Sequence, residues 1–93
     1  MVVGLLRLDL HIPAADSLKA KRSVLNHVKE RLRTRFNASV AEVEHQDLWQ
    51  RAALGVAVVS GDAGGLDKVL HDILACVERE HRLSVLDYQI RID

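Results

Sequence analysis

The sequence predicts an α+β protein with the ferredoxin-like order βαββαβ, in which a four-stranded antiparallel sheet carries two helices on one face. Three observations predict this fold. Two segments have the apolar spacing of amphipathic helices, four have the alternation or the Ala and Val content of strands, and the six segments follow one another in that order. A chain of 93 residues has room for one such domain, spanning residues 1–93.

The first part of the chain predicts a strand followed by a helix. Residues 2–12 end in strict alternation of apolar and polar side chains, and Pro13 ends the strand because proline cannot donate to a ladder. Ser17 is a suitable N-cap for the helix that follows, whose apolar stripe at helical spacing runs down to Phe36. Asn37 is a suitable stop for this helix.

The remainder predicts two strands, a second helix and a last strand. Residues 38–45 and 52–61 are rich in Ala and Val, and the polar stretch QDLWQR between them is typical of a hairpin loop. The stretch SGDAGGLD predicts a turn in which Asp62 caps the second helix, which has an apolar stripe of its own. Residues 83–92 alternate again and predict the fourth strand.

Charge is unevenly distributed along the chain. Thirteen Lys and Arg balance thirteen Asp and Glu, yet residues 17–36 hold seven of the cations and one acid, Glu30. No apolar run is long enough to cross a bilayer, no signal peptide is recognisable at the start, and the single Cys76 cannot form an internal disulfide. We therefore expect a cytoplasmic protein that does not contact a membrane.

The third predicted strand is apolar on both faces. The side away from the helices has no cover in the predicted fold, and small residues there allow close approach of another sheet. We therefore expect a homodimer that forms through this open sheet face, although scattered exposed Ala and Val are also normal on a monomer. The residues expected to make this protein contact are Ala53, Gly55, Ala57 and Val59, together with Trp49 in the hairpin loop.

The basic first helix is the candidate site for phosphate or nucleic acid. On a helical wheel, four cations form a stripe roughly 20 Å long beside the apolar face. Lys21 lies on the apolar arc itself, where we expect it to snorkel over an edge or to reach an acid such as Asp9 or Asp16. The candidate binding residues are Lys19, Lys21, Arg22, Lys29 and Arg33.

Two interpretations of this helix stay open. Cations near a helix N-terminus are mildly unfavourable, so their repetition there favours an external anion held by the side chains and free N–H groups together. Alternatively, the charges form a solvated face or pair with a second subunit. No aromatic residue is expected on the open face of the central strands, so any RNA would be held through its backbone rather than by base stacking on the sheet.

The remaining candidates for chemistry are weak. Glu44, His45 and Asp47 gather in the hairpin loop, but no second His or Cys sits at a metal-ligand spacing. Cys76 borders an apolar stripe, which is typical of a buried thiol rather than of a nucleophile. We expect no catalytic residues, no metal and no cofactor.

Two blocks of sequence, SLKAKRSVL and FNASVAEVEHQDLWQRAALGVAVVS, resemble the bacterial YlxP-like proteins of unknown function. The resemblance covers essentially the whole chain and implies a ferredoxin-like fold without known enzyme activity, cofactor or catalytic residue. Genes of that family often lie among those for translation and ribosome maturation. The resemblance thus implies a role linked to RNA or the ribosome. Together with the basic first helix, it leads us to expect a small non-enzymatic protein that binds RNA or the ribosome through phosphate-backbone contacts of that helix, and the alternative is a dimeric adaptor that contacts a protein through the sheet face and the Trp49 loop.

Overall fold

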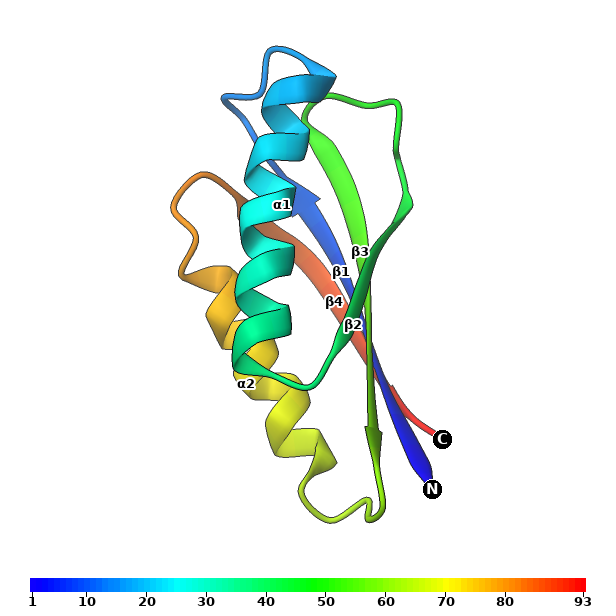
Figure 1. Ribbon diagram of the computed structural model, residues 1–93. Coiled ribbons are helices and arrows are strands. Elements are labelled where there is room, and N and C mark those ends of the chain that lie inside the picture. The colour runs from blue at the N-terminus through cyan, green and yellow to red at the C-terminus, as the bar shows by residue number, and fades with distance from the viewer.

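The computed structural model describes all 93 residues and has the predicted order of elements (Figure 1). The strands form one antiparallel sheet in the order β2-β3-β1-β4, and both helices lie on the same face of it. The predicted ferredoxin-like fold class is therefore confirmed. No helix has the length and apolar character needed to cross a membrane. The elements are β1 (Val2–His11), α1 (Leu18–Arg35), β2 (Ser39–Glu44), β3 (Arg51–Ser60), α2 (Leu66–Glu78) and β4 (Ser84–Ile92).

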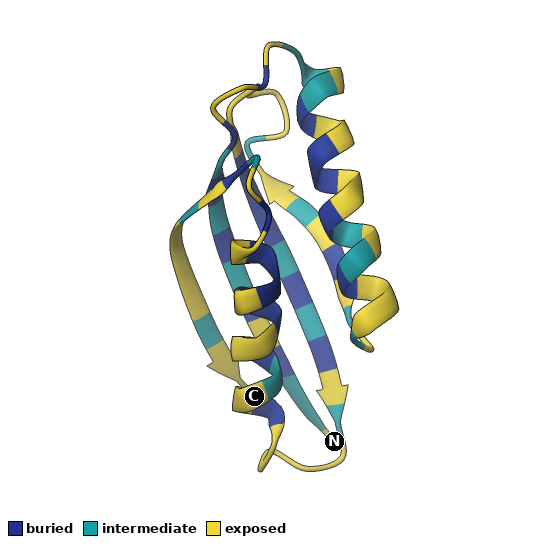
Figure 2. Cartoon of the chain, turned by 90° about the vertical axis from the view of Figure 1, so that its left-hand side faces the viewer, coloured by how far each residue is buried: buried dark blue, intermediate teal, exposed yellow.

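The hydrophobic core lies between the sheet and the two helices. Buried and less buried residues alternate along the two central strands, as Figure 2 shows. Register pairs such as Leu6↔Val56 and Leu8↔Leu54 place large apolar side chains side by side under the helices. The same alternation turns the intervening residues to the open face, which no element of the chain covers.

The sequence explains where each helix begins. The Ser17 hydroxyl accepts the backbone N–H of Ala20 at 3.0 Å, which is the N-cap that the sequence predicts for α1. The prediction that Asp62 caps α2 is wrong. Its carboxylate accepts the N–H of Gly64 at 2.9 Å, and Gly65 is the N-cap without a side-chain bond. Asp62 stands three residues before the N-cap, so it orders the turn rather than the helix.

Lys21 is fully buried and does not snorkel; it reaches an acid, but neither Asp9 nor Asp16 is its partner. Its Nζ lies 2.9 Å from Oε2 of Glu42, whose side chain is 13% exposed. Asp9 pairs with Ala53 in the register and so faces away from the helices, and Asp16 is exposed in the loop before α1. A buried ammonium needs a carboxylate on the helix-facing side of the sheet, and Glu42 is the one that β2 provides.

The Lys21 ammonium also holds the β2–β3 hairpin loop. Its Nζ donates to three backbone carbonyls, at distances of 2.9, 3.3 and 3.3 Å, which belong to His45, Gln46 and Arg51. These bonds satisfy the donors of the ammonium and tie both ends of the loop to the second turn of α1. We name this arrangement, Lys21 with Glu42 and the three carbonyls, the Lys21 clamp.

Glu80 is the second buried charge, in the turn that follows α2. Its carboxylate accepts two bonds from the Arg82 guanidinium, at 2.8 and 3.1 Å, and one from the Arg82 backbone N–H. The bonds from Arg82 lower the pKa of Glu80 from 4.5 to about 2, against the opposing effect of burial. His27 of α1 lies 3.8 Å from the same carboxylate, so this turn is also linked to the first helix.

We predict that Lys21→Met lowers the free energy of unfolding by about 3–5 kcal/mol, measured by urea denaturation. The substitution keeps the apolar stem but leaves Glu42 and three carbonyls without their donor. Lys19→Met removes an exposed lysine of the same helix and should change stability by less than about 0.5 kcal/mol. Equal effects of the two substitutions would contradict the structural role of the clamp.

We predict that Glu80→Gln lowers stability at neutral pH by about 1–3 kcal/mol and flattens the acid limb of the stability curve. The pKa of Glu80 is depressed in the folded state, so its contribution is present above about pH 4.5 and is lost as the pH falls toward about 2. Wild type and variant should therefore converge near pH 2 in thermal melts. Glu78→Gln, at an exposed carboxylate without an ion-pair partner, is the control that should leave the pH profile unchanged.

Candidate nucleic-acid interface

A row of cations without acidic partners runs along α1. Lys19, Arg22 and Arg33 are exposed and Lys29 is partly exposed. The side chains of α1 make two ion pairs within the chain, Lys21–Glu42 and His27–Glu80, and neither involves these four residues. We name Lys19, Arg22, Lys29 and Arg33 the α1 stripe. None of its four charges is in an ion pair, although Glu30, the one acid of the helix, lies three residues before Arg33, so they stay available to an external anion.

The α1 stripe lies on the side of the helix next to the edge strand β2. A guanidinium nitrogen of Arg33 donates to the backbone carbonyl of Val40 at 2.9 Å, which fixes this relation. Because β2 is an edge strand of the sheet, the bond ties the last turns of α1 to that edge. Arg33 therefore keeps only part of its hydrogen-bonding capacity for a ligand.

The structure removes Lys21 from the predicted phosphate-binding set. Its ammonium is 0% exposed and is saturated by the clamp, so it cannot reach an external anion. Two further cations, Arg31 and Arg35, fall outside the stripe. Arg35 lines a hollow between the end of α1 and the start of α2, together with Phe36 and Leu66. The seven cations of residues 17–36 thus divide into three groups, of which the stripe is the largest.

The first turn of α1 favours an anion on electrostatic grounds. It contains no acidic residue, and its free N–H groups carry partial positive charge. Lys19 and Arg22 add two full charges at the same end. Two carboxylates without an ion pair, those of Asp16 and Asp47, lie in the adjoining loops and reduce the potential there. The strongest positive region therefore follows the helix rather than the loops.

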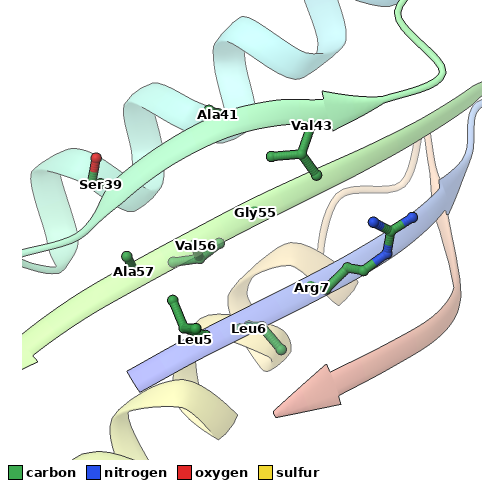
Figure 3. A pocket seen from close by; sticks show the side chains of 9 residues that line it. All are labelled: Leu5, Leu6, Arg7, Ser39, Ala41, Val43, Gly55, Val56 and Ala57. Atoms are coloured by element: carbon green, nitrogen blue, oxygen red, sulfur yellow. The ribbon is translucent and has the colours of Figure 1, made fainter. Parts of the chain in front are cut away.

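The open sheet face differs from the prediction at two of its four small residues. Ala53 is 0% exposed, because the register places it between Asp9 and Glu44, so it is not accessible to a second copy. At Gly55, an added Cβ would lie 2.9 Å from a methyl of Val43. Figure 3 shows Val43 leaning over Gly55. The glycine thus makes room for a side chain of its own protomer.

The rest of this face forms a shallow apolar hollow of about 330 Å³ between β1, β3 and β2 (Figure 3). Its apolar side chains include Leu5, Ala41, Val43 and Ala57. Val59, at the end of β3, is 58% exposed. The sequence alone did not identify Leu5, Ala41 or Val43, because their contribution to this face becomes visible only when β1 and β2 flank β3.

One end of the hollow is charged. Arg7 donates to the carboxylates of Glu44 and Asp9, which come from β2 and β1. The bond from Arg7 lowers the pKa of Glu44. The cation is already matched by two acids, so it offers little to an anionic ligand. An apolar surface is therefore the main property of the open face.

Trp49 stands exposed on the hairpin loop, as predicted. Its exposed fraction is 54%, and that of the neighbouring Leu48 is 44%. No group of three or more His, Cys, Asp or Glu side chains in the molecule is arranged to hold a metal ion. Cys76 is buried in the core.

Comparisons with known proteins match both the fold and the sequence. The solved structures that resemble this chain include a de novo designed protein, Foldit4, with a TM-score of 0.58 and 12% identity over 99% of this chain and 94% of that one. Another is the C-terminal segment of the alpha subunit of aIF2 from Pyrococcus abyssi, with a TM-score of 0.53 and 11% identity over 97% of this chain and 49% of that one. At such low identities these similarities show the fold alone.

Sequence relatives define the family. The chain is 36% identical over 77 residues to the uncharacterised protein YlxP of Bacillus subtilis (strain 168), which covers 83% of this chain and 84% of that protein. The family model described as "Protein of unknown function (DUF503)" matches residues 3–90. Neither description names an activity. The chain therefore belongs to the DUF503 family, a family of proteins of unknown function.

Proposed function

We propose that this protein is a non-enzymatic RNA-binding protein that contacts ribosomal RNA, within ribosomal particles, through the α1 stripe. The observation that carries the proposal is the row of four cations without a carboxylate partner. Spaced along 15 residues of helix, they span about 21 Å, enough to follow several consecutive phosphates.

The contacts would be made to the phosphate backbone and would depend little on base sequence. Lys and Arg side chains on a helix surface neutralise phosphates, and each neutralised phosphate releases counterions. The central strands offer no aromatic side chain on the open face, where sheet-based RNA-binding modules stack bases. Tyr88 lies on the helix side, paired with Leu8 and in contact with the ring of His71.

We expect binding to ribosomal RNA to weaken with salt, measured by filter binding across a salt series. A stripe that neutralises four phosphates gives a log–log slope of roughly −2.8 on a single strand, since each contact adds about −0.7. The variant Arg22→Glu/Lys29→Glu/Arg33→Glu should lose most of this slope and most of the affinity. Binding that is flat with salt would contradict the proposal.

The matched control reverses three charges elsewhere. Arg31→Glu/Arg35→Glu/Lys68→Glu carries the same change in net charge but leaves the α1 stripe intact, so it should keep most of the affinity and the slope. An equal loss in both variants would show that net charge, rather than the stripe, governs binding. Co-sedimentation with ribosomal particles at low salt, and release at high salt, extends the test to the particle itself.

We also propose, as a second candidate, that the open sheet face forms a homodimer or receives a protein partner in an adaptor role. What favours it is the apolar hollow with exposed Leu5 and Val43 in its lining, together with the exposed Val59 further along the same strand face. A surface with both a hollow and protruding apolar side chains can pair with its own copy across a two-fold axis. The molecule measures 42 × 21 × 17 Å, so its broad side is on the order of the roughly 800 Å² per partner that a standard interface buries.

We predict that Leu5→Glu and Val59→Glu each convert the dimer to a monomer, measured by light scattering after size exclusion. Each places a charge in the apolar contact, where it would be buried without a partner. Leu48→Glu introduces the same charge at a similarly exposed leucine of the hairpin loop and should stay dimeric. A wild-type protein that is monomeric at its highest soluble concentration would contradict the dimer proposal.

A further inference from the structure

We propose that Trp49 completes the RNA site as a stacking platform for an unpaired base, so that the protein selects single-stranded over double-stranded RNA. This inference rests on the proposed function and deepens it by naming the class of RNA. It assigns the base contact to the hairpin loop, beside the start of α1, and not to the sheet.

The hairpin loop is docked against the start of α1 by bonds on both sides of Trp49. The Lys21 ammonium holds the carbonyls of Gln46 and Arg51. The side-chain amide of Gln50 donates to the carbonyls of Pro13 and Ala15, at 3.2 and 3.4 Å, in the segment that leads into the helix. Figure 1 shows the loop beside the beginning of α1. The backbone on each side of Trp49 is therefore fixed at the end of the α1 stripe that carries Lys19 and Arg22.

The backbone of the loop supports the same conclusion. His45 adopts a φ of 63°, a left-handed conformation that non-glycine residues rarely take. Its carbonyl accepts both the Lys21 ammonium, at 2.9 Å, and the N–H of Leu48, at 3.0 Å. Such a conformation persists where surrounding bonds hold it, so the loop presents Trp49 in a preorganised position.

The Trp49 side chain makes no hydrogen bond or aromatic contact within its own protomer and is largely exposed. It is 54% exposed, its indole N–H has no hydrogen-bond partner, and the aromatic contact within the chain joins His71 to Tyr88 instead. Large aromatic side chains are normally buried for their apolar area, and a buried indole finds a partner for its N–H. More than half of this indole is therefore accessible to an external group, on a loop whose backbone is anchored.

Neighbouring charges favour RNA as that group. Three cations at this end of the molecule, Lys19, Arg22 and Arg51, make no ion pair, and they outnumber the two carboxylates without an ion pair in the adjoining loops, those of Asp16 and Asp47. Single-stranded nucleic acids are commonly held by cations along the backbone together with aromatic rings on which bases stack. In a duplex the bases are already stacked and paired, so a duplex would gain the phosphate contacts but not the contact with Trp49.

The chain contains one tryptophan, so tryptophan fluorescence, excited selectively over that of Tyr88, reports on Trp49 alone. The experiment titrates the 93-residue chain with an oligouridine of about 12 nucleotides and with a duplex of the same length. We expect the single strand to quench the fluorescence along its binding curve. The duplex should bind in a salt-dependent manner with little quenching.

Substitutions separate stacking from charge. Trp49→Ala should weaken binding of the single strand by about 5- to 150-fold and leave duplex binding unchanged, because stacking on one aromatic side chain accounts for that range. Trp49→Phe keeps an aromatic ring and should restore most of the affinity. Leu48→Ala, at the neighbouring exposed residue, is the matched control and should bind like wild type.

The outcomes distinguish this inference from the proposed function. Salt-dependent binding of the single strand without quenching, and with Trp49→Ala equal to wild type, overturns the stacking role and leaves the α1 stripe in place. Absence of binding to either RNA overturns both proposals. Fluorescence that changes with protein concentration but not with RNA assigns Trp49 to a protein contact and likewise overturns the inference.

Discussion

The buried ammonium of Lys21 is the interaction on which the functional surfaces depend. A charge that is 0% exposed is tolerated only because Glu42 and three loop carbonyls surround it. The same bonds fix α1 against the edge strand β2 and hold the hairpin loop at the start of the helix. The clamp thus determines where the α1 stripe lies relative to Trp49.

Ion pairing within the fold determines which cations of this neutral chain are free to bind a ligand. Arg7 is matched by Asp9 and Glu44 on the open face, and Arg82 is matched by the buried Glu80. The α1 stripe has no such partners, although the chain contains as many acids as bases. The overall composition is balanced, so it does not explain why four cations of α1 lack a partner. The fold explains this, because it places the acids of the chain other than Glu30 elsewhere.

The sequence predicted most of the fold, since local patterns carry that information. Alternation identified the faces of β1, and the N-cap at Ser17 was confirmed by its bond to Ala20. The predictions were wrong for residues that could make more than one kind of contact. Asp62 bonds within its own turn instead of capping α2, and Gly55 accommodates Val43 of the same sheet. The contact of Asp62 with Gly64 and that of Val43 with Gly55 both depend on the exact path of the backbone, which the sequence pattern does not give.

Periodicity determined which side chains face the core, which face solvent, and that four cations share one side of α1, because each of these follows from the repeat of a helix or strand. It also showed that Lys21 lies on the apolar arc. Only the tertiary structure decided that Glu42, 21 residues further along the chain, would be its partner, and that the hairpin loop carrying Trp49 would be held against the start of α1. Contacts between distant segments depend on how the sheet register and the helix pack together, and no local repeat encodes that geometry.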